Sequence, residues 1–503
     1  MKKLLLMVLT LVLACTAVGC TDGPVEDEDG FLTVEEIIEM AKKNTSSNSG
    51  SGDIEITGTP NFTVPASGYD GSDVTITFYH TMGKNLSDVL ALYITEFNKI
   101  YPNITVVHEQ VGSYDDVKSQ ISMELTTGKG PSLAYCYPDH VAMYNLANAV
   151  VTLDSLIDST ASDGNGGSLG LTAEQKADFI QGYYNEGRQF GDGLMYSMPF
   201  SKSTEVLYYN KTFFTEHEIP VPTHWFNESA DDTTSLEAVC QQILAIDPLS
   251  IPLGYDSEAN LFITMCEQIG SPYTTAVGSE HFLFDNDINK TFCKEFRRWF
   301  SQGYMTTQEL LGSYTSNLFV SQDELNSYMS IGSSAGATHQ RPEKVDGKYP
   351  FEVGIAPIPQ MNPANPKVIS QGPSICVFQK SNPQEVIASW LFVKFLTTSV
   401  EFQAEFSMAS GYVPVLKSVL NNTSYANFLN SANGGDKIAA LSAKVCLEQE
   451  QSYYTSPAFT GSSKARDEVG LLLTKILANS DQAENAMINK AFADAVNNCK
   501  FYS

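Results

Sequence analysis

One serine lies in a motif with the spacing that surrounds the nucleophile of a hydrolase. Gly332, Ser334 and Gly336 form a G-x-S-x-G motif after a predicted strand, and in α/β-hydrolases this motif presents the serine on a sharp turn. The chemistry also requires an acid and then a histidine further along the chain. The only histidine after Ser334 is His339, five residues on. A triad in this order cannot be built, so the sequence argues against an esterase.

Other catalytic and cofactor motifs are absent from the sequence. It contains no H-E-x-x-H, no Walker loop and no G-x-G-x-x-G after a strand. Its nine cysteines include no C-x-x-C pair, which argues against a zinc site. We therefore expect no metal and no cofactor. Acidic residues are numerous, and counting them does not exclude the carboxylate pair of a glycosidase. The alternatives to a binding protein are thus a cell-surface hydrolase of carbohydrate or ester substrates, and an adhesin.

Size and charge narrow the range of partners. The chain has 503 residues, 43% of them hydrophobic, which is more than one compact domain usually holds. Its net charge of -28 repels nucleic acid and anionic lipid headgroups. We expect a monomer without nucleic-acid partners.

The N-terminus has the features of a bacterial lipoprotein signal. Lys2 and Lys3 precede an apolar run, 4–14, which is too short to span a bilayer. Small residues then lead to Cys20, as in a lipobox. This predicts a signal peptide over 1–19 and lipidation of Cys20, which would anchor the chain to the cell membrane. The seven later cysteines are scattered and are expected to be buried as small apolar side chains.

The region 20–71 is predicted to be a flexible acidic and Ser/Gly-rich tether. Within it, Thr33 and Glu36 have the spacing of a capping box that opens a short helix ending near Lys43. The stretch 44–52 is rich in Ser, Gly and Asn, a composition typical of linkers. Further along the chain, Thr172 and Gln175 have the spacing of a second capping box, which predicts a helix through Tyr184.

The globular part opens with alternating strands and helices. Hydrophobic residues alternate over 74–79 and recur at helical spacing over 86–100 and 117–125, while 104–108 and 133–137 read as further strands. This order predicts a parallel sheet with right-handed crossovers. Ligands bind beyond the carboxyl ends of such strands, so the loops after Phe78, His108 and Tyr137 are the first places to expect a site.

Several short motifs recur along the chain in a fixed order. They are Phe78–Gly83, Phe97–Pro102, Ile104–Val106, Tyr114–Asp116, Gly128–Pro131, Pro199–Lys211, Gly354–Pro359 and Gly411–Pro414. These motifs resemble those of bacterial extracellular solute-binding proteins of the carbohydrate type, similar to the glycerol-3-phosphate and multiple-sugar binders. Their collinear order from about 72 to about 480 makes the set more specific than any one motif.

The resemblance implies a two-lobed α/β fold of the type II periplasmic-binding-protein kind, with a ligand cleft between the lobes. The chain would cross between lobes three times, near 197–203, 329–335 and 411–414. Lobe 1 would then comprise 72–200 and 334–410, and lobe 2 would comprise 204–328 and 415–503. The implied function is the substrate-binding component of an ABC importer, which closes on a sugar, oligosaccharide or polyol and is recognised by the permease. No catalytic residue is implied.

Ligand-binding residues follow from the resemblance by position. They are Tyr114 at the start of a helix, Ser203, Ser333 and Tyr412 at the crossings, Gly372 where backbone approaches the ligand, and Arg466. Trp225 is added because aromatic rings pack on the C–H faces of sugars. One position departs from the glycerol-3-phosphate binders, in which a carboxylate follows the tyrosine of the third strand. Here Pro138 follows Tyr137, and Asp139 is the candidate.

Overall fold

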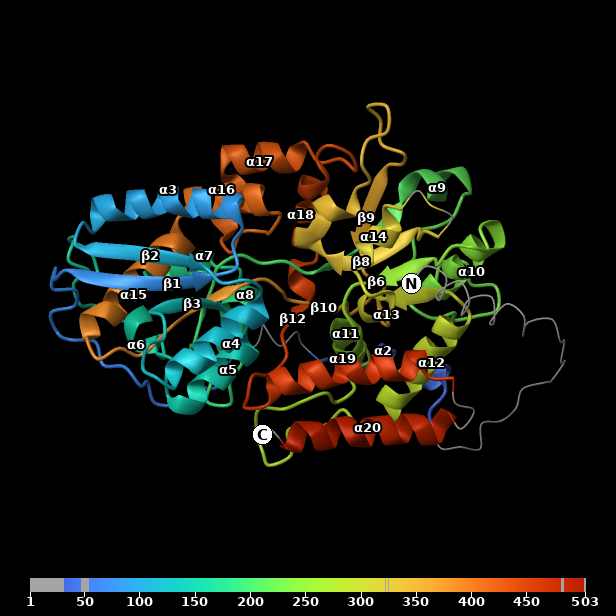
Figure 1. Cartoon of the computed structure of the whole chain (residues 1–503), viewed down its shortest axis with the longest axis horizontal. Coiled ribbons are helices and arrows are strands. Elements are labelled where there is room, and N and C mark those ends of the chain that lie inside the picture. The colour runs from blue at the N-terminus through green and yellow to red at the C-terminus, as the bar shows by residue number, and fades with distance from the viewer. Residues whose placement is uncertain (1–30, 47–53, 322, 324, 481–483, 502–503) are drawn as a thin grey trace.

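The computed structural model describes residues 31–46, 54–321, 323, 325–480 and 484–501. In this part of the chain the backbone forms two lobes, each built around a five-stranded sheet with helices packed around it (Figure 1). The lobes are called lobe 1, which contains β1, and lobe 2, which contains β5.

The sheet of lobe 1 is largely formed by the first part of the chain. Across the sheet its strands are β2 (Ile104–Gln110), β1 (Val74–His80), β3 (Leu133–Cys136), β11 (Ser374–Val377) and β4 (Met198–Pro199). β1 runs parallel to β2 and β3, whereas β11 is antiparallel to β3 and β4. Val74, Ile76 and Phe78 are buried, as their alternation predicts. The parallel strand–helix–strand start is confirmed.

Helices surround this sheet and join its strands. They are α3 (Lys84–Ile100), α4 (Tyr114–Leu125), α5 (Pro138–Tyr144), α6 (Asp154–Ile157), α7 (Ala173–Asp178), α8 (Gln181–Glu186), α15 (Pro383–Thr398), α16 (Val400–Ser410) and α17 (Thr423–Asn430). The capping boxes predicted at Thr33 and at Thr172 are both present. The helix that Thr172 opens ends at Asp178 rather than Tyr184, because Phe179 is extended and buried and the Ile180 N–H donates to Val415 O.

The sheet of lobe 2 mixes parallel and antiparallel pairs. Its strands are, in order, β7 (Met305–Thr307), β6 (Leu253–Tyr255), β8 (Met329–Ser333), β5 (Glu205–Asn210) and β9 (Val353–Pro357). The helices of this lobe are α9 (Lys211–Glu216), α10 (Leu236–Ile246), α11 (Glu258–Ile269), α12 (Asp287–Ser301), α13 (Gln308–Leu311), α14 (Ser316–Phe319), α18 (Ile438–Glu448), α19 (Ser462–Ala478) and α20 (Glu484–Phe501).

Two of the predicted lobe boundaries are wrong. β9 pairs with β5 along its whole length, so the chain from 334 to 357 stays with lobe 2 instead of entering lobe 1. The crossing predicted near 329–335 is therefore the end of β8 inside the second sheet. The chain returns to lobe 1 only between β10 (Val368–Ile369) and β11. Ser418 donates from its N–H and its hydroxyl to Asp178, so the start of 415–503 contacts lobe 1.

The crossing segments lie side by side between the lobes. Lys202 and Val413 exchange backbone hydrogen bonds, and Ser203 and Gln371 do the same. Beside them β10 pairs in parallel with β12 (Tyr453–Tyr454), and both strands lie between the two sheets in Figure 1. This bundle of extended segments is the connection about which the lobes can rotate.

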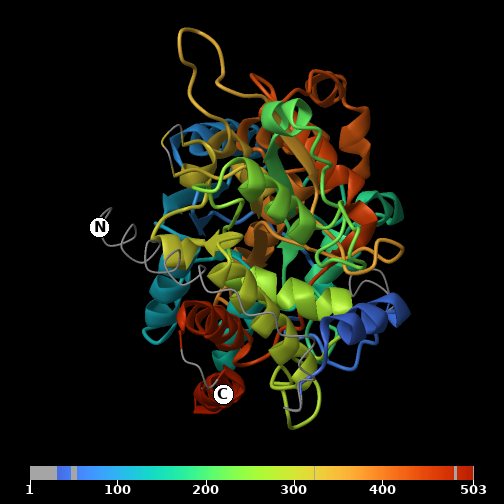
Figure 2. The same ribbon diagram turned by 90° about the vertical axis from the view of Figure 1, so that its right-hand side faces the viewer.

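The predicted flexible tether is wrong for the described residues between 31 and 71. α2 (Val34–Lys43) lies against lobe 2 (Figures 1 and 2), with Ile37 and Ala41 fully buried on α11 and α12. Further along, Asn61 exchanges hydrogen bonds with Thr152 of lobe 1. Composition indicated a linker, but the amphipathic face of α2 provides enough apolar area to dock. Cys20 and the predicted signal peptide lie outside the described residues.

The predicted burial of the cysteines is confirmed. All seven after Cys20 are buried free thiols. Among the helices of the described residues, none is both long and apolar enough to cross a membrane.

Candidate functional site

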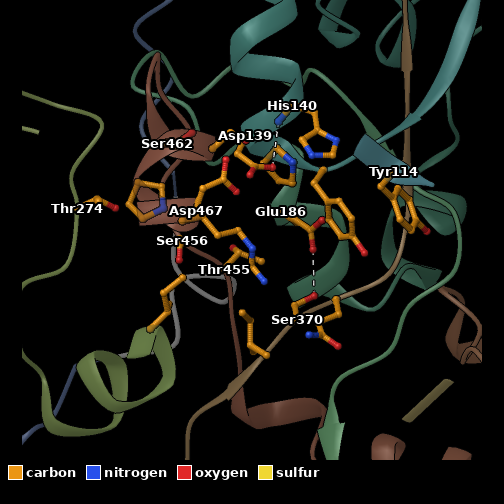
Figure 3. A pocket seen from close by; sticks show the side chains of 18 of the residues that line it. Tyr114, Asp139, His140, Glu186, Thr274, Ser370, Thr455, Ser456, Ser462 and Asp467 are labelled. Carbon is orange, nitrogen blue, oxygen red and sulfur yellow. Dashed lines mark hydrogen bonds between the residues drawn. The ribbon is translucent and has the colours of Figure 1, made fainter. Parts of the chain in front are cut away.

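A pocket of about 260 Å³ opens between the two lobes. Lobe 1 contributes the first residues of α4 and α5, and lobe 2 contributes the start of α19 together with the segment after β12. Figure 3 shows these side chains converging on one space. Of the loops predicted to line a site, the one after Tyr137 lines this pocket, whereas those directly after Phe78 and His108 do not.

Tyrosines form the lobe 1 wall. Tyr114 is the first residue of α4, held in place by the capping box of Ser113. Its ring centroid lies 4.9 Å from that of Tyr137 and 6.4 Å from that of Tyr135. Burial raises the pKa of Tyr114 well above its ordinary value, and the neighbouring Tyr412 hydroxyl adds to the effect. The phenols therefore stay protonated and present hydroxyl groups as well as flat apolar faces.

Arg466 on α19 occupies the lobe 2 side of the pocket. Its guanidinium donates to Asn260 Oδ1, and the Asn260 amide donates to Glu205 Oε1 at 2.8 Å. Glu205 also accepts from the Tyr255 hydroxyl at 2.6 Å. Burial raises the pKa of Glu205 to about 7, against the opposing effect of these two hydrogen bonds and of Arg466. This buried network fixes the position of the guanidinium.

Three of the predicted residues come together beside the pocket, two on the crossing segments and Ser333 at the end of β8. Ser333 Oγ lies 3.4 Å from Ser203 Oγ. Gly372 has φ of 93°, and a Cβ there would lie 2.5 Å from Ser201 O. Only glycine fits this approach of two backbones. Ser203, Ser333 and Gly372 do not line the pocket themselves, although Ser370 and Gln371 do.

The three remaining predicted residues differ in their position relative to the pocket. Asp139 lines the pocket, and Tyr412 reaches it only through its contact with Tyr114. Trp225 does not line it: the indole is 1% exposed and donates to Gln268 Oε1 at 2.8 Å within the core of lobe 2. A tryptophan enclosed in this way cannot stack on a ligand in the pocket. The pocket brings together Tyr114, Asp139 and Arg466.

Sequence reasoning missed several pocket residues. Lys118 lies one helical turn after Tyr114, so helical spacing could have indicated it. His140 directly follows Asp139, just after the loop that was expected to line a site. Glu186, from α8, had no such signal. It forms an ion pair with Lys202 at 2.6 Å and accepts from the Ser370 hydroxyl at 3.0 Å.

Two polar atoms at the pocket have no hydrogen-bond partner within the described part of the chain. They are His140 Nδ1 and Ser456 Oγ. Buried polar atoms in proteins are nearly always hydrogen-bonded, to protein, water or ligand. Their position at a shared cavity indicates a polar occupant.

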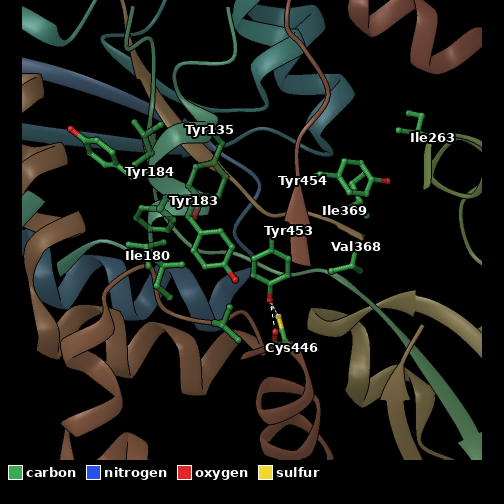
Figure 4. Packing of buried hydrophobic residues seen from close by; sticks show 14 of the residues in the cluster. Tyr135, Ile180, Tyr183, Tyr184, Ile263, Val368, Ile369, Cys446, Tyr453 and Tyr454 are labelled. Atoms are coloured by element: carbon green, nitrogen blue, oxygen red, sulfur yellow. Dashed lines mark hydrogen bonds between the residues drawn. The ribbon is translucent and has the colours of Figure 1, made fainter. Parts of the chain in front are cut away.

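Aromatic side chains pack where the lobes meet behind the pocket (Figure 4). Tyr183 of lobe 1 stacks on Tyr453 of β12 with ring centroids 5.1 Å apart. Tyr454 forms a 2.8 Å hydrogen bond with Thr264 on α11. The apolar contact between the lobes is thus concentrated beside the crossings, away from the mouth of the pocket.

The G-x-S-x-G serine has a structural role. Ser334 is fully buried, and its hydroxyl accepts from Thr204 N–H at 3.1 Å. His339 is exposed. An enclosed serine with no histidine beside it cannot attack a substrate, which agrees with the argument from the sequence.

Comparisons with known proteins give the family. The profile described as bacterial extracellular solute-binding protein matches residues 93–428, more than half of the chain. The sn-glycerol-3-phosphate-binding periplasmic protein UgpB of Yersinia enterocolitica is 23% identical over 369 residues, covering 72% of this chain and 78% of that protein.

Solved structures show the same two-lobed α/β fold. UgpB of Mycobacterium tuberculosis, in complex with glycerophosphocholine, superposes with a TM-score of 0.64 at 16% identity over 85% of this chain and 98% of that one. The substrate-binding protein Lmo0181 of Listeria monocytogenes, in complex with cycloalternan, gives a TM-score of 0.64 at 17% identity over 85% and 98%. The chain therefore belongs to the bacterial extracellular solute-binding proteins, which act outside the cytoplasm and bind solutes rather than convert them.

Proposed function

We propose that this protein is the substrate-binding component of an ABC importer and that it captures a sugar, oligosaccharide or related polyol between its lobes. The observation that carries the proposal is the pocket, whose walls come from both lobes and include polar atoms that have no hydrogen-bond partner among the described residues. A ligand there would contact both lobes at once and so favour the closed arrangement by its differential affinity.

The composition of the pocket supports a hydroxyl-rich ligand. Tyr114, Tyr137 and Tyr273 supply flat apolar faces, which suit the C–H faces of sugar rings. Ser370 and Gln371 supply neutral hydrogen-bonding groups from the crossing segment. Sugars need both kinds of contact because each ring carries hydroxyls around an apolar body.

Titration calorimetry with a panel of mono- and oligosaccharides tests this function. We expect one-to-one binding of at least one class, no chemical change in the recovered sugar, and a smaller radius of gyration in solution scattering when the ligand is bound. Product formation, or binding without any change in scattering, would contradict capture by closure.

We also propose that Cys20 is lipidated and that the protein acts as a monomer beside its permease. The lipobox-like sequence before Cys20 supports the anchor. Expression of the full chain and of Cys20→Ala in a bacterial host checks it. The parent should fractionate with membranes and the variant should not, whereas membrane association of both would contradict the anchor.

A further inference from the structure

The pocket contains more acid than base. Asp115, Asp139, Glu186 and Asp467 line it, against two permanent cations, Lys118 and Arg466. His140 is buried, and burial lowers its pKa against the opposing charges of Asp139 and Asp115, which favours the neutral ring.

Two of the four acids already have partners. Glu186 is paired with Lys202 at 2.6 Å, and Asp115 is paired with Lys118 at 2.7 Å. Burial opposes the charge of Lys118, yet Asp115, Asp467 and Asp139 together raise its pKa. The Lys118 ammonium is therefore shared among the carboxylates of Asp115, Asp139 and Asp467.

Asp139 and Asp467 have no salt bridge within the described residues. They come from opposite lobes, at the starts of α5 and α19, which lie against each other. Partial desolvation raises the pKa of Asp467, and the charges of Asp115 and Asp139 add to the effect while Lys118 opposes it. Bringing like charges together is unfavourable, so a further positive charge between these carboxylates would favour closure of the lobes.

His140 gives independent support for a donor at this end of the pocket. It is 6% exposed, and its Nδ1 has no hydrogen-bond partner in the described structure. Figure 3 shows His140, Asp139 and Asp467 gathered at one end of the pocket. A neutral imidazole has one acceptor nitrogen, which an N–H group of the ligand can satisfy.

Arg466 is held on the lobe 2 side of the pocket. Its guanidinium donates to Asn260 Oδ1, and its charge acts on Glu205 and also on Tyr137 and His140. It forms no salt bridge with Asp139 or Asp467 within the described residues, so no direct ion pair balances these two carboxylates.

We propose that the ligand carries a primary ammonium group and that this group sits between Asp139 and Asp467. The inference rests on the proposed function and narrows it to amine-bearing sugars or polyols. A primary ammonium has three N–H donors, and the two carboxylates and His140 offer acceptors for all three. The same arrangement disfavours a sugar phosphate, because both carboxylates would repel it.

Matched sugars test the inference by calorimetry. The probes are glucosamine, N-acetylglucosamine, glucose and glucose 6-phosphate, together with the dimers to tetramers of chitosan and chitin. An amine-bearing member should bind at least about tenfold more tightly than its N-acetyl or neutral counterpart, which is the scale of one charge-assisted hydrogen bond. Equal or tighter binding of the neutral or phosphorylated member would overturn the inference while leaving capture of a polyol intact. Failure of every amine to bind would also overturn it.

Variants that each remove one negative charge test whether the preference for amine-bearing sugars arises in the pocket. Asp467→Asn, which keeps size and polarity, should weaken amine binding on the order of tenfold and by clearly more than it weakens binding of a neutral sugar. Asp494→Asn is the matched control, since Asp494 lies on α20 and pairs with the exposed Lys490. Equal effects of Asp467→Asn and Asp494→Asn would show that only net charge matters and would sink the proposal. A thermal melt of each variant confirms folding.

Discussion

The Lys202 ammonium lies 2.6 Å from the Glu186 carboxylate, and neither side chain reaches solvent. Lys202 also donates to Gly372 O at 3.1 Å and to Ser374 Oγ at 3.0 Å. The pair joins a crossing segment to α8 in the wall of the pocket. A charge in this position is tolerated only because its partners are fixed around it.

Lys202→Met should destabilise the fold by about 3–5 kcal/mol, because it leaves the Glu186 carboxylate buried without a counter-charge. The double variant with Glu186→Leu should recover most of this loss, since it removes both charges. Urea denaturation measures each free energy of unfolding. Lys490→Met is the control, as its pair with Asp494 is exposed and is worth less than about 1 kcal/mol. Similar losses for the two single variants would contradict the buried-pair argument.

Glu205 should make stability fall as the pH rises from about 4.5 to about 7. Its pKa is raised from 4.5 to about 7 in the folded chain, so the folded state holds the proton more strongly than the unfolded state does. Above pH 7 both states have lost the proton and the penalty is constant, at roughly 3 kcal/mol from the size of the shift. Denaturation of the parent and of Glu205→Gln at pH 4.5 and pH 8 checks this. The gap between the two proteins should change in favour of the variant at pH 8, and parallel curves would refute the assignment.

Gly372→Ala should weaken both folding and closure. A Cβ at this position would lie 2.5 Å from Ser201 O and 2.8 Å from Lys202 Cα, and φ is 93°, so the backbone must shift at the crossing. We expect a loss of at least about 1–2 kcal/mol from the left-handed conformation alone. Gly336→Ala is the comparison, because its Cβ would meet nothing within 4 Å. Melting temperatures distinguish the two, and equal values would contradict the close approach.

Trp225→Phe should lower stability without changing ligand affinity. The indole is buried and its N–H donates to Gln268 Oε1, which also accepts from Met361 N–H. The change therefore leaves a cavity and removes one of these two hydrogen bonds, with a cost of about 1–3 kcal/mol. Tyr114→Ala, at the pocket, should instead reduce affinity for any sugar that the parent binds. Calorimetry and denaturation on both variants separate the roles. A large loss of affinity in Trp225→Phe with normal stability would restore the predicted stacking role.

Local sequence patterns predicted the elements better than their pairing. The alternation over 74–79 and the capping residues Thr33 and Thr172 depend on neighbouring residues, and all three are confirmed. The lobe assignment of β9 failed because its partner β5 lies far back in the chain. Strand periodicity says which face is buried but does not say which strand lies alongside.

The pocket was predictable only in part for a similar reason. Tyr114, Asp139 and Arg466 stand at the starts of helices, a position that the family resemblance could mark. Glu186 lies at the end of the short helix α8, where no motif marks it, and lines the pocket while paired with the buried Lys202. Trp225 was misplaced because residue type alone does not separate a core tryptophan from one that stacks on a ligand.

The N-terminal segment forms a further connection between the two lobes. Asn44 donates to Glu267 O on α11, whereas Thr57 N–H donates to Asp192 O on the other lobe. Only a dozen or so residues separate these attachment points, and each residue spans at most about 3.6 Å. Wide opening of the lobes would have to extend this segment fully or break the hydrogen bonds at one of its ends. The length of this segment therefore sets a limit on the separation of the lobes that is independent of the crossing bundle.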